Sequence, residues 1–164
     1  MKPSAAILLA AALLAASLAP SPALAQKASP ADSQAIAACL KKADGEGKYP
    51  GACIGAVADP CIVAASGKNN DWENSKACAA RELAIWNALM ADALKRANAG
   101  AEKDMKAAVA ESQAAFTKSR DALCPIYDKL DPGMVMGGAN YCRLQETARR
   151  TLMLRRLADA VNEH

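Results

Sequence analysis

Apolar residues recur every three to four positions along three long stretches of the chain. The stretches run from about residue 72 to 98, from about 101 to 127 and from about 139 to 161. This spacing gathers apolar side chains on one face of an α-helix, so it predicts three amphipathic helices. The three stripes consist of Leu83, Trp86, Leu89, Met90, Ala93, Leu94 and Ala97; of Met105, Val109, Phe116 and Leu123; and of Leu144, Ala148, Leu154, Ala158 and Val161.

Short connections separate the three predicted helices. Asn98-Ala99-Gly100 is a typical helix stop, and glycines with a proline between residues 131 and 138 mark the second connection. Helices joined in this way pack antiparallel to their neighbours. The low aromatic content, 4%, also favours helices over large sheets. The sequence therefore predicts an all-α fold: a three-helix up-down-up bundle with a cysteine-rich N-terminal segment, stapled by disulfides.

A less regular segment precedes these helices. Residues 26–52 are interpreted as a polar leader followed by a short helix over 31–43, where Ile36 and Leu40 have helical spacing. Residues 52–58 are expected to form another short helical turn that ends before Pro60. The main helical domain is assigned to residues 53–161.

The first 25 residues have the pattern of a cleavable signal peptide. Lys2 supplies a positive charge, an apolar run extends from residue 5 to 19, and Ala23-Leu24-Ala25 offers small residues at a cleavage point. The apolar run is shorter than the roughly 20 residues that a membrane-spanning helix needs. The mature chain is therefore expected to begin at Gln26, to have no membrane span, and to be periplasmic or secreted.

The chain has six cysteines: Cys39, Cys53, Cys61, Cys78, Cys124 and Cys142. An even number of cysteines in an exported chain favours disulfide bonds. A zinc site is disfavoured, because C-x-x-C spacing and histidine partners are missing. The helix pattern brings three of the six to one end of the bundle. The preferred pairing is Cys124–Cys142, Cys61–Cys78 and Cys39–Cys53, and the alternative combines Cys53–Cys61 with Cys39–Cys78.

Charge and composition disfavour several function classes. The formal net charge is +3, and removal of Lys2 with the signal peptide leaves about +2, too little to indicate a nucleic-acid partner. His164 is the single histidine and stands at the end of the sequence. No Gly-x-Ser-x-Gly, Ser-x-x-Lys or Glu-x-x-His pattern accompanies the cysteines. We therefore expect neither catalysis nor a metal or other cofactor.

Several motifs in combination resemble a known family. They are Cys61; Cys78-x-x-Arg81-Glu82-x-x-x-Trp86; Gln113-x-x-Phe116-x-x-x-Arg120-Asp121-x-x-Cys124; Gly137-Gly138; and Cys142-x-x-x-x-Thr147-x-x-Arg150-x-x-x-Leu154. The chain resembles the LprI-type lysozyme-inhibitor domain family, a group of small exported bacterial proteins. The likeness extends over about residues 53–157. It implies a protein that works by binding, with a lysozyme-type glycosidase or another envelope protein as its partner.

Two sets of candidate functional residues follow. Glu82 and Arg120 fall at the same end of two predicted antiparallel helices, where an ion pair between them would fix the helix register. The residues proposed for partner binding are Arg120, Asp121, Gly137, Gly138, Arg143, Arg149 and Arg150.

Arginine in this second set suits a glycosidase partner. Lysozyme-type glycosidases use two carboxylates in a cleft, and arginine binds carboxylates through paired hydrogen bonds. One hypothesis is that the protein occludes this cleft, with the connection over residues 133–140 as an inserted loop. The alternative is a structural or stress-related envelope protein that binds another protein or the cell wall and has no catalytic activity.

Overall fold

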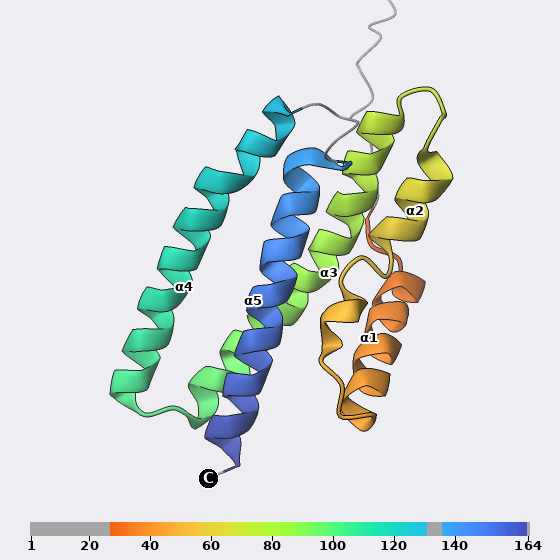
Figure 1. The fold of residues 1–164 in the computed structure, drawn as a ribbon. Coiled ribbons are helices and arrows are strands. Elements are labelled where there is room, and N and C mark those ends of the chain that lie inside the picture. Colours follow the sequence, from red (N-terminus) through yellow and green to blue (C-terminus); the bar gives the residue numbers. More distant parts are fainter. Residues whose placement is uncertain (1–26, 131–135, 164) are drawn as a thin grey trace, which may run out of the picture.

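The computed structural model describes residues 27–130 and 136–163, and every regular element in these ranges is a helix (Figure 1). The all-α prediction is therefore confirmed for this part of the chain. The signal-peptide prediction lies outside the described residues, as do residues 133–135 of the connection proposed to enter a cleft. The elements are α1 (Pro30–Gly45), η1 (Pro50–Cys53), α2 (Ala58–Ala65), α3 (Asp71–Gly100), α4 (Lys103–Leu123), η2 (Cys124–Lys129) and α5 (Gly138–Asn162).

The core lies between α3, α5 and the N-terminal helices. Trp86 of α3 and Leu144 of α5 are fully buried at its centre. Ala79 and Ala148 are also fully buried, and such small side chains let two helices approach closely. Ile36 of α1 completes the apolar contacts from the opposite side.

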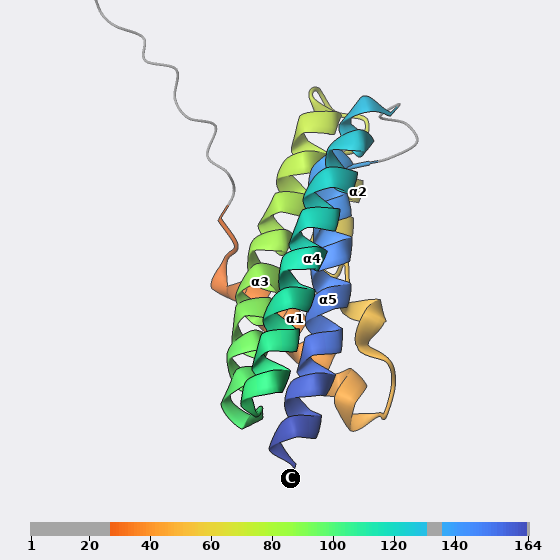
Figure 2. The same cartoon turned by 90° about the vertical axis from the view of Figure 1, so that its left-hand side faces the viewer.

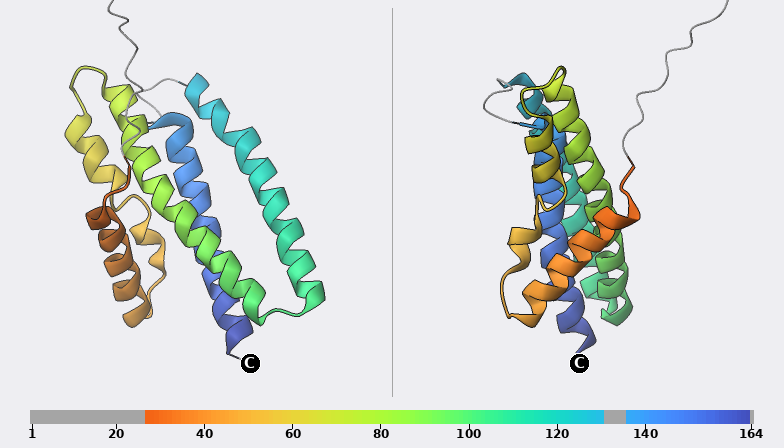
Figure 3. Two further views of the ribbon diagram at one scale, coloured as in Figure 1. Left: turned by 180° about the vertical axis from the view of Figure 1, so that it is seen from behind. Right: turned by 90° about the vertical axis from the view of Figure 1, so that its right-hand side faces the viewer.

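The N-terminal helices and α4 lie on opposite sides of the α3–α5 pair, as Figures 1 and 3 show. Ile36, Leu40, Val57 and Ile62 of the N-terminal segment belong to the main core. A bundle of the three long helices alone therefore does not describe the core, because α1, η1 and α2 supply a large part of it.

Helix α4 is attached differently from the other long helices. Figure 2 shows it lying lengthwise along α3 and α5. Its predicted apolar stripe is only partly covered: Val109 is buried, Phe116 is half-buried, and Met105 and Leu123 are exposed. Polar contacts to α5, described below, hold much of this helix in place.

Local sequence explains where the short helices begin. Ser29 caps α1: its side chain accepts a hydrogen bond from the Asp32 backbone N–H at 3.1 Å, and the Asp32 carboxylate accepts one from the Ser29 N–H at 2.8 Å. The prediction that a turn ends before Pro60 was wrong, because Pro60 lies in the first turn of α2. A proline is tolerated there, since the N–H groups of a first turn have no partner within the helix.

Three disulfides join the elements. Cys39 bonds to Cys53 between α1 and η1, Cys61 bonds to Cys78 between α2 and α3, and Cys124 bonds to Cys142 between η2 and α5. These are the preferred pairs of the sequence analysis, and the alternative pairing is not formed. Each bond ties an irregular or short element to a helix of the core.

Candidate functional site

The side chain of Glu82 is buried at the junction between α3 and the N-terminal segment. One carboxylate oxygen accepts hydrogen bonds from the backbone N–H of Gly55 at 2.8 Å and from Trp86 Nε1 at 2.8 Å. The other oxygen accepts them from the N–H groups of Val57 at 2.8 Å and Ala58 at 2.7 Å. Because Val57 and Ala58 begin α2, the carboxylate satisfies otherwise unpaired donors at the start of that helix.

The predicted ion pair between Glu82 and Arg120 was wrong. Arg120 pairs instead with the neighbouring Asp121, at 2.9 Å, and donates a hydrogen bond to the Thr147 hydroxyl of α5 at 3.1 Å. Glu82 is occupied by the four donors above, all from α3 and the segment before it. The prediction rested on the two residues lying at the same height along neighbouring helices. Height along a helix does not determine toward which neighbouring element a side chain points.

A row of arginines joins α4 to α5. Arg150, with 8% of its surface exposed, donates to Gln113 Oε1 and to the Ser112 hydroxyl, each at 3.0 Å. The guanidinium groups of Arg120 and Arg150 lie 5.5 and 5.6 Å from the centre of the Phe116 ring, within cation–π range. Burial lowers the pKa of Arg150. Hydrogen bonds and cation–π contacts thus attach α4 to α5, whereas a broad buried apolar face is missing from the described part of α4.

Gly137 and Gly138 begin α5 in a conformation that suits glycine. Their φ angles are +80° and +50°, a region that other residues adopt only with strain. A Cβ atom on Gly138 would lie 2.3 Å from Asp128 Oδ1 and 2.9 Å from the Trp72 ring. Asp128 accepts a hydrogen bond from the Ala139 N–H at 2.9 Å and thereby caps α5 from η2.

Gly138→Ala is expected to destabilise the protein by at least about 2 kcal/mol, because the methyl group adds a clash to an unfavourable φ. Thermal unfolding followed by circular dichroism would measure the change. Gly45→Ala is the matched control, since no atom lies within 4 Å of its added Cβ and its φ is not positive. Equal midpoints for the two variants would contradict this account of Gly138.

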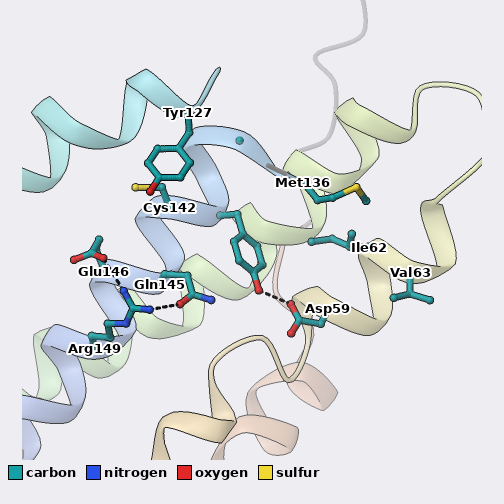
Figure 4. A pocket seen from close by; sticks show the side chains of 11 residues that line it. Asp59, Ile62, Val63, Tyr127, Met136, Cys142, Gln145, Glu146 and Arg149 are labelled. Atoms are coloured by element: carbon teal, nitrogen blue, oxygen red, sulfur yellow. Dashed lines mark hydrogen bonds and ion pairs between the residues drawn. The ribbon is translucent and has the colours of Figure 1, made fainter. Parts of the chain in front are cut away.

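A groove of about 520 Å³ separates α2 from the N-terminal half of α5 (Figure 4). Apolar side chains form part of its wall, including Ile62, the 74% exposed Val63 and the half-exposed Met136. Its polar lining consists of Asp59, Tyr127, Tyr141, Gln145, Glu146 and Arg149. The volume falls within the range of about 300–1,000 Å³ that is usual for ligand pockets.

Hydrogen bonds order the polar side chains of the groove. The Tyr141 hydroxyl donates to Asp59 Oδ1 at 2.8 Å and so bridges α5 and α2; a dashed line at Asp59 marks this bond in Figure 4. Burial, together with the Asp59 carboxylate, raises the pKa of Tyr141, so this hydroxyl stays protonated at neutral pH. On the other wall Arg149 donates to Glu146 and to Gln145 Oε1, each at 2.9 Å.

A second surface adjoins the groove along the outer side of α5. Arg149, Met153 and Arg156 follow one another at spacings of four and three residues, so they share one helix face. Met153 is 54% exposed, and the Arg156 guanidinium lies 5.1 Å from the ring centre of Tyr49, itself 58% exposed. These four residues, Tyr49, Arg149, Met153 and Arg156, are called the α5 ridge below.

The predicted partner-binding residues lie on two different sides of α5, and two of them belong to α4. Gly138 and Arg149 line the groove, with Gly137 adjacent to it. Arg120, Asp121 and Arg150 lie on the α4 side, and Arg143 precedes Arg150 by two helical turns in the same row.

Sequence reasoning missed the remaining residues of the groove and the ridge. The spacing of Arg149, Met153 and Arg156 is visible in the sequence and could have revealed the ridge. No local signal could have brought Asp59 next to Tyr141, because the two are 82 residues apart.

Comparison with known proteins agrees with the motifs. A family model described as "Lysozyme inhibitor LprI" matches residues 61–154, more than half of the chain. The chain belongs to the LprI lysozyme inhibitor family. No curated protein and no solved structure shows significant similarity to it. The LprI match begins at Cys61 in α2 and ends at Leu154 in α5, so it includes Arg149 and Met153 of the ridge and leaves out α1 and η1.

Neither a membrane-spanning helix nor a metal-binding cluster is found in the described part of this LprI family member. Across residues 27–130 and 136–163 no helix combines the length and the apolar character needed to cross a membrane. The same ranges contain no cluster of three histidine, cysteine or acidic residues that could hold a metal ion.

Proposed function

We propose that this protein is an exported binding protein that lowers the activity of lysozyme-type glycosidases by covering their catalytic cleft. Membership of the LprI lysozyme inhibitor family supports this class of partner. The three disulfides support a place of action outside the cytoplasm, where such bonds form and persist.

The α5 ridge is the observation that carries the proposal. Arginine, tyrosine and methionine are the residue types enriched at protein interfaces, and the ridge exposes all three. Arg156 flanks Met153 and offers paired hydrogen-bond donors to a carboxylate of a glycosidase cleft, whereas Arg149 is already paired with Glu146. A single exposed helix face is convex, so its shape suits insertion into a cleft.

Met153→Ala and Arg156→Ala are each expected to raise the concentration needed for half-inhibition about five- to thirty-fold. This range corresponds to the loss of about 1–2 kcal/mol at a central interface residue. The measurement is a lytic assay in which the purified, oxidised protein is titrated against lysozymes of several classes.

Lys95→Ala is the matched control, because it removes one exposed positive charge from α3, away from the ridge. We expect this variant to inhibit as the unmodified protein does. No inhibition of any lysozyme class at a large molar excess would overturn the proposed function. Inhibition that is unchanged in both ridge variants would overturn the assignment of the contact to the ridge.

A further inference from the structure

The groove between α2 and α5 has a lining that the cleft-covering function does not use. Arg149 is shared with the ridge, but Tyr127, Tyr141 and the apolar side chains of α2 belong to the groove alone. Figure 4 shows Tyr127, which η2 supplies, beside the start of α5, and Ile62 with Val63 on α2. Tyr141 belongs to α5 itself. The groove is therefore a separate candidate site with its own chemistry.

Polar groups on the wall formed by α5 and η2 keep unused hydrogen-bonding capacity. Arg149 binds one oxygen of Glu146 and the Gln145 carbonyl oxygen, and Gln145 also bonds to Tyr141, which leaves the second Glu146 oxygen and one amide N–H of Gln145 for another partner. The Tyr127 hydroxyl makes no hydrogen bond to another described residue. Because Arg149 already holds the side chains of Gln145 and Glu146 in place, a ligand would lose little affinity to their ordering.

The charges of the groove favour a neutral ligand. Asp59 and Glu146 contribute two carboxylates, and Arg149 is the one guanidinium in the lining. Arg149 is already paired with Glu146 at 2.9 Å. An anion would meet no surplus of positive charge here, and Asp59 is engaged by a neutral hydroxyl. Hydroxyl and amide groups of a neutral ligand can use the remaining donors and acceptors without displacing these pairs.

Apolar and aromatic side chains form the rest of the groove lining. Tyrosine combines an apolar ring with a polar tip, and Tyr127 and Tyr141 present both to the groove. Sugar rings carry hydroxyl groups around their edge and C–H groups on their faces, so they match a surface of this mixed kind. The apolar corner formed by Ile62, Val63 and Met136 could receive a methyl group, such as that of an acetamido substituent.

We propose that this groove binds a short glycan of 2-acetamido sugars. The carbohydrate class rests on the groove itself, whereas the choice of amino sugars rests also on the proposed function, since such sugars form the substrate of lysozyme-type glycosidases. The protein then holds both the enzyme, through the α5 ridge, and the polymer that the enzyme cleaves. A peptide ligand is the competing occupant and is included in the test.

The experiment is isothermal titration of the full oxidised protein with tri-N-acetylchitotriose. Saturable binding is expected, and cellotriose, which lacks the acetamido groups, is expected to bind at least about five-fold more weakly. Gln145→Ala and Tyr127→Ala are each expected to weaken binding of the chitotriose about five- to ten-fold. Gln145 is partly exposed and bonds to the side chains of Arg149 and Tyr141 at the surface of α5, so its replacement is expected to leave the fold intact.

Met153→Ala serves as the matched control on the same helix, and it is expected to bind the chitotriose normally. Absence of saturable binding overturns the proposal, as does undiminished binding in both groove variants. Equal binding of cellotriose overturns the amino-sugar class, and tighter binding of an apolar peptide overturns the carbohydrate class. Sugar binding without inhibition of any lysozyme would sink the proposed function alone, and inhibition without sugar binding would sink this inference alone.

Discussion

Replacing Glu82 with glutamine is expected to lower the free energy of unfolding by about 2–6 kcal/mol. The carboxylate accepts four hydrogen bonds at 2.7–2.8 Å in a site with no solvent exposure. Glutamine has one acceptor oxygen, so its NH₂ group faces two N–H donors that lose their partner. Each buried donor without a partner costs about 1–3 kcal/mol. Since small domains are stable by only about 5–15 kcal/mol, this loss is severe.

Urea unfolding followed by far-ultraviolet circular dichroism would measure the loss. Hydrogen exchange gives a second readout, because the amides of Gly55, Val57 and Ala58 should lose protection before the rest of the molecule. Glu111→Gln is the matched control: the same chemical change at an exposed position of α4 should alter stability by less than about 0.5 kcal/mol. If the Glu82 variant unfolded at the urea concentration of the control, the carboxylate would not be the anchor described here.

Removal of the Cys124–Cys142 disulfide by the double change Cys124→Ala and Cys142→Ala is expected to cost about 3 kcal/mol. The bond closes a loop with a sequence separation of 18, which restricts the unfolded chain. Its local effect should be larger on α4 than on α3, because α4 has one buried residue, Val109. Without the disulfide, the polar contacts around Arg150 remain as the main attachment of this helix.

The paired change Cys39→Ala and Cys53→Ala provides the control. This disulfide has a similar separation, 14, so the expected loss of global stability is again about 3 kcal/mol. Hydrogen exchange should distinguish the two variants: α4 amides should exchange faster only when Cys124 and Cys142 are replaced. Equal protection of α4 in both would contradict the view that the second disulfide secures this helix.

The long helices were well predicted because their signals are local. The stretch expected over 72–98 is α3, Asp71–Gly100, and that expected over 139–161 is α5, Gly138–Asn162. Apolar spacing and helix stops depend on neighbours in sequence, so they can be read without the fold. The preference for Cys124–Cys142 followed from the same pattern, because helix direction brings these two helix ends together, whereas two pairings of the other four cysteines stayed open until the structure was known.

The packing of α4 was harder to predict. Its stripe of Met105, Val109, Phe116 and Leu123 has the spacing of a buried helix face, yet Met105 and Leu123 are exposed. Periodicity shows which face is apolar, but it does not show whether another element covers that face. The N-terminal segment occupies the opposite side of α3 and α5 and supplies the core contacts that a three-helix bundle would have taken from α4.

The sequence by itself determined the helical class, the approximate extent of α3 and α5, the Cys124–Cys142 preference and the resemblance to the LprI family. Only the tertiary structure decided the three backbone partners of Glu82, which lie 24 to 27 residues earlier in the chain, and the meeting of Asp59 with Tyr141. Helical periodicity acts over a few residues, whereas these hydrogen bonds arise only when separate elements pack. The groove and the division of the arginines between two faces of α5 depend on such contacts, so no local pattern could have revealed them.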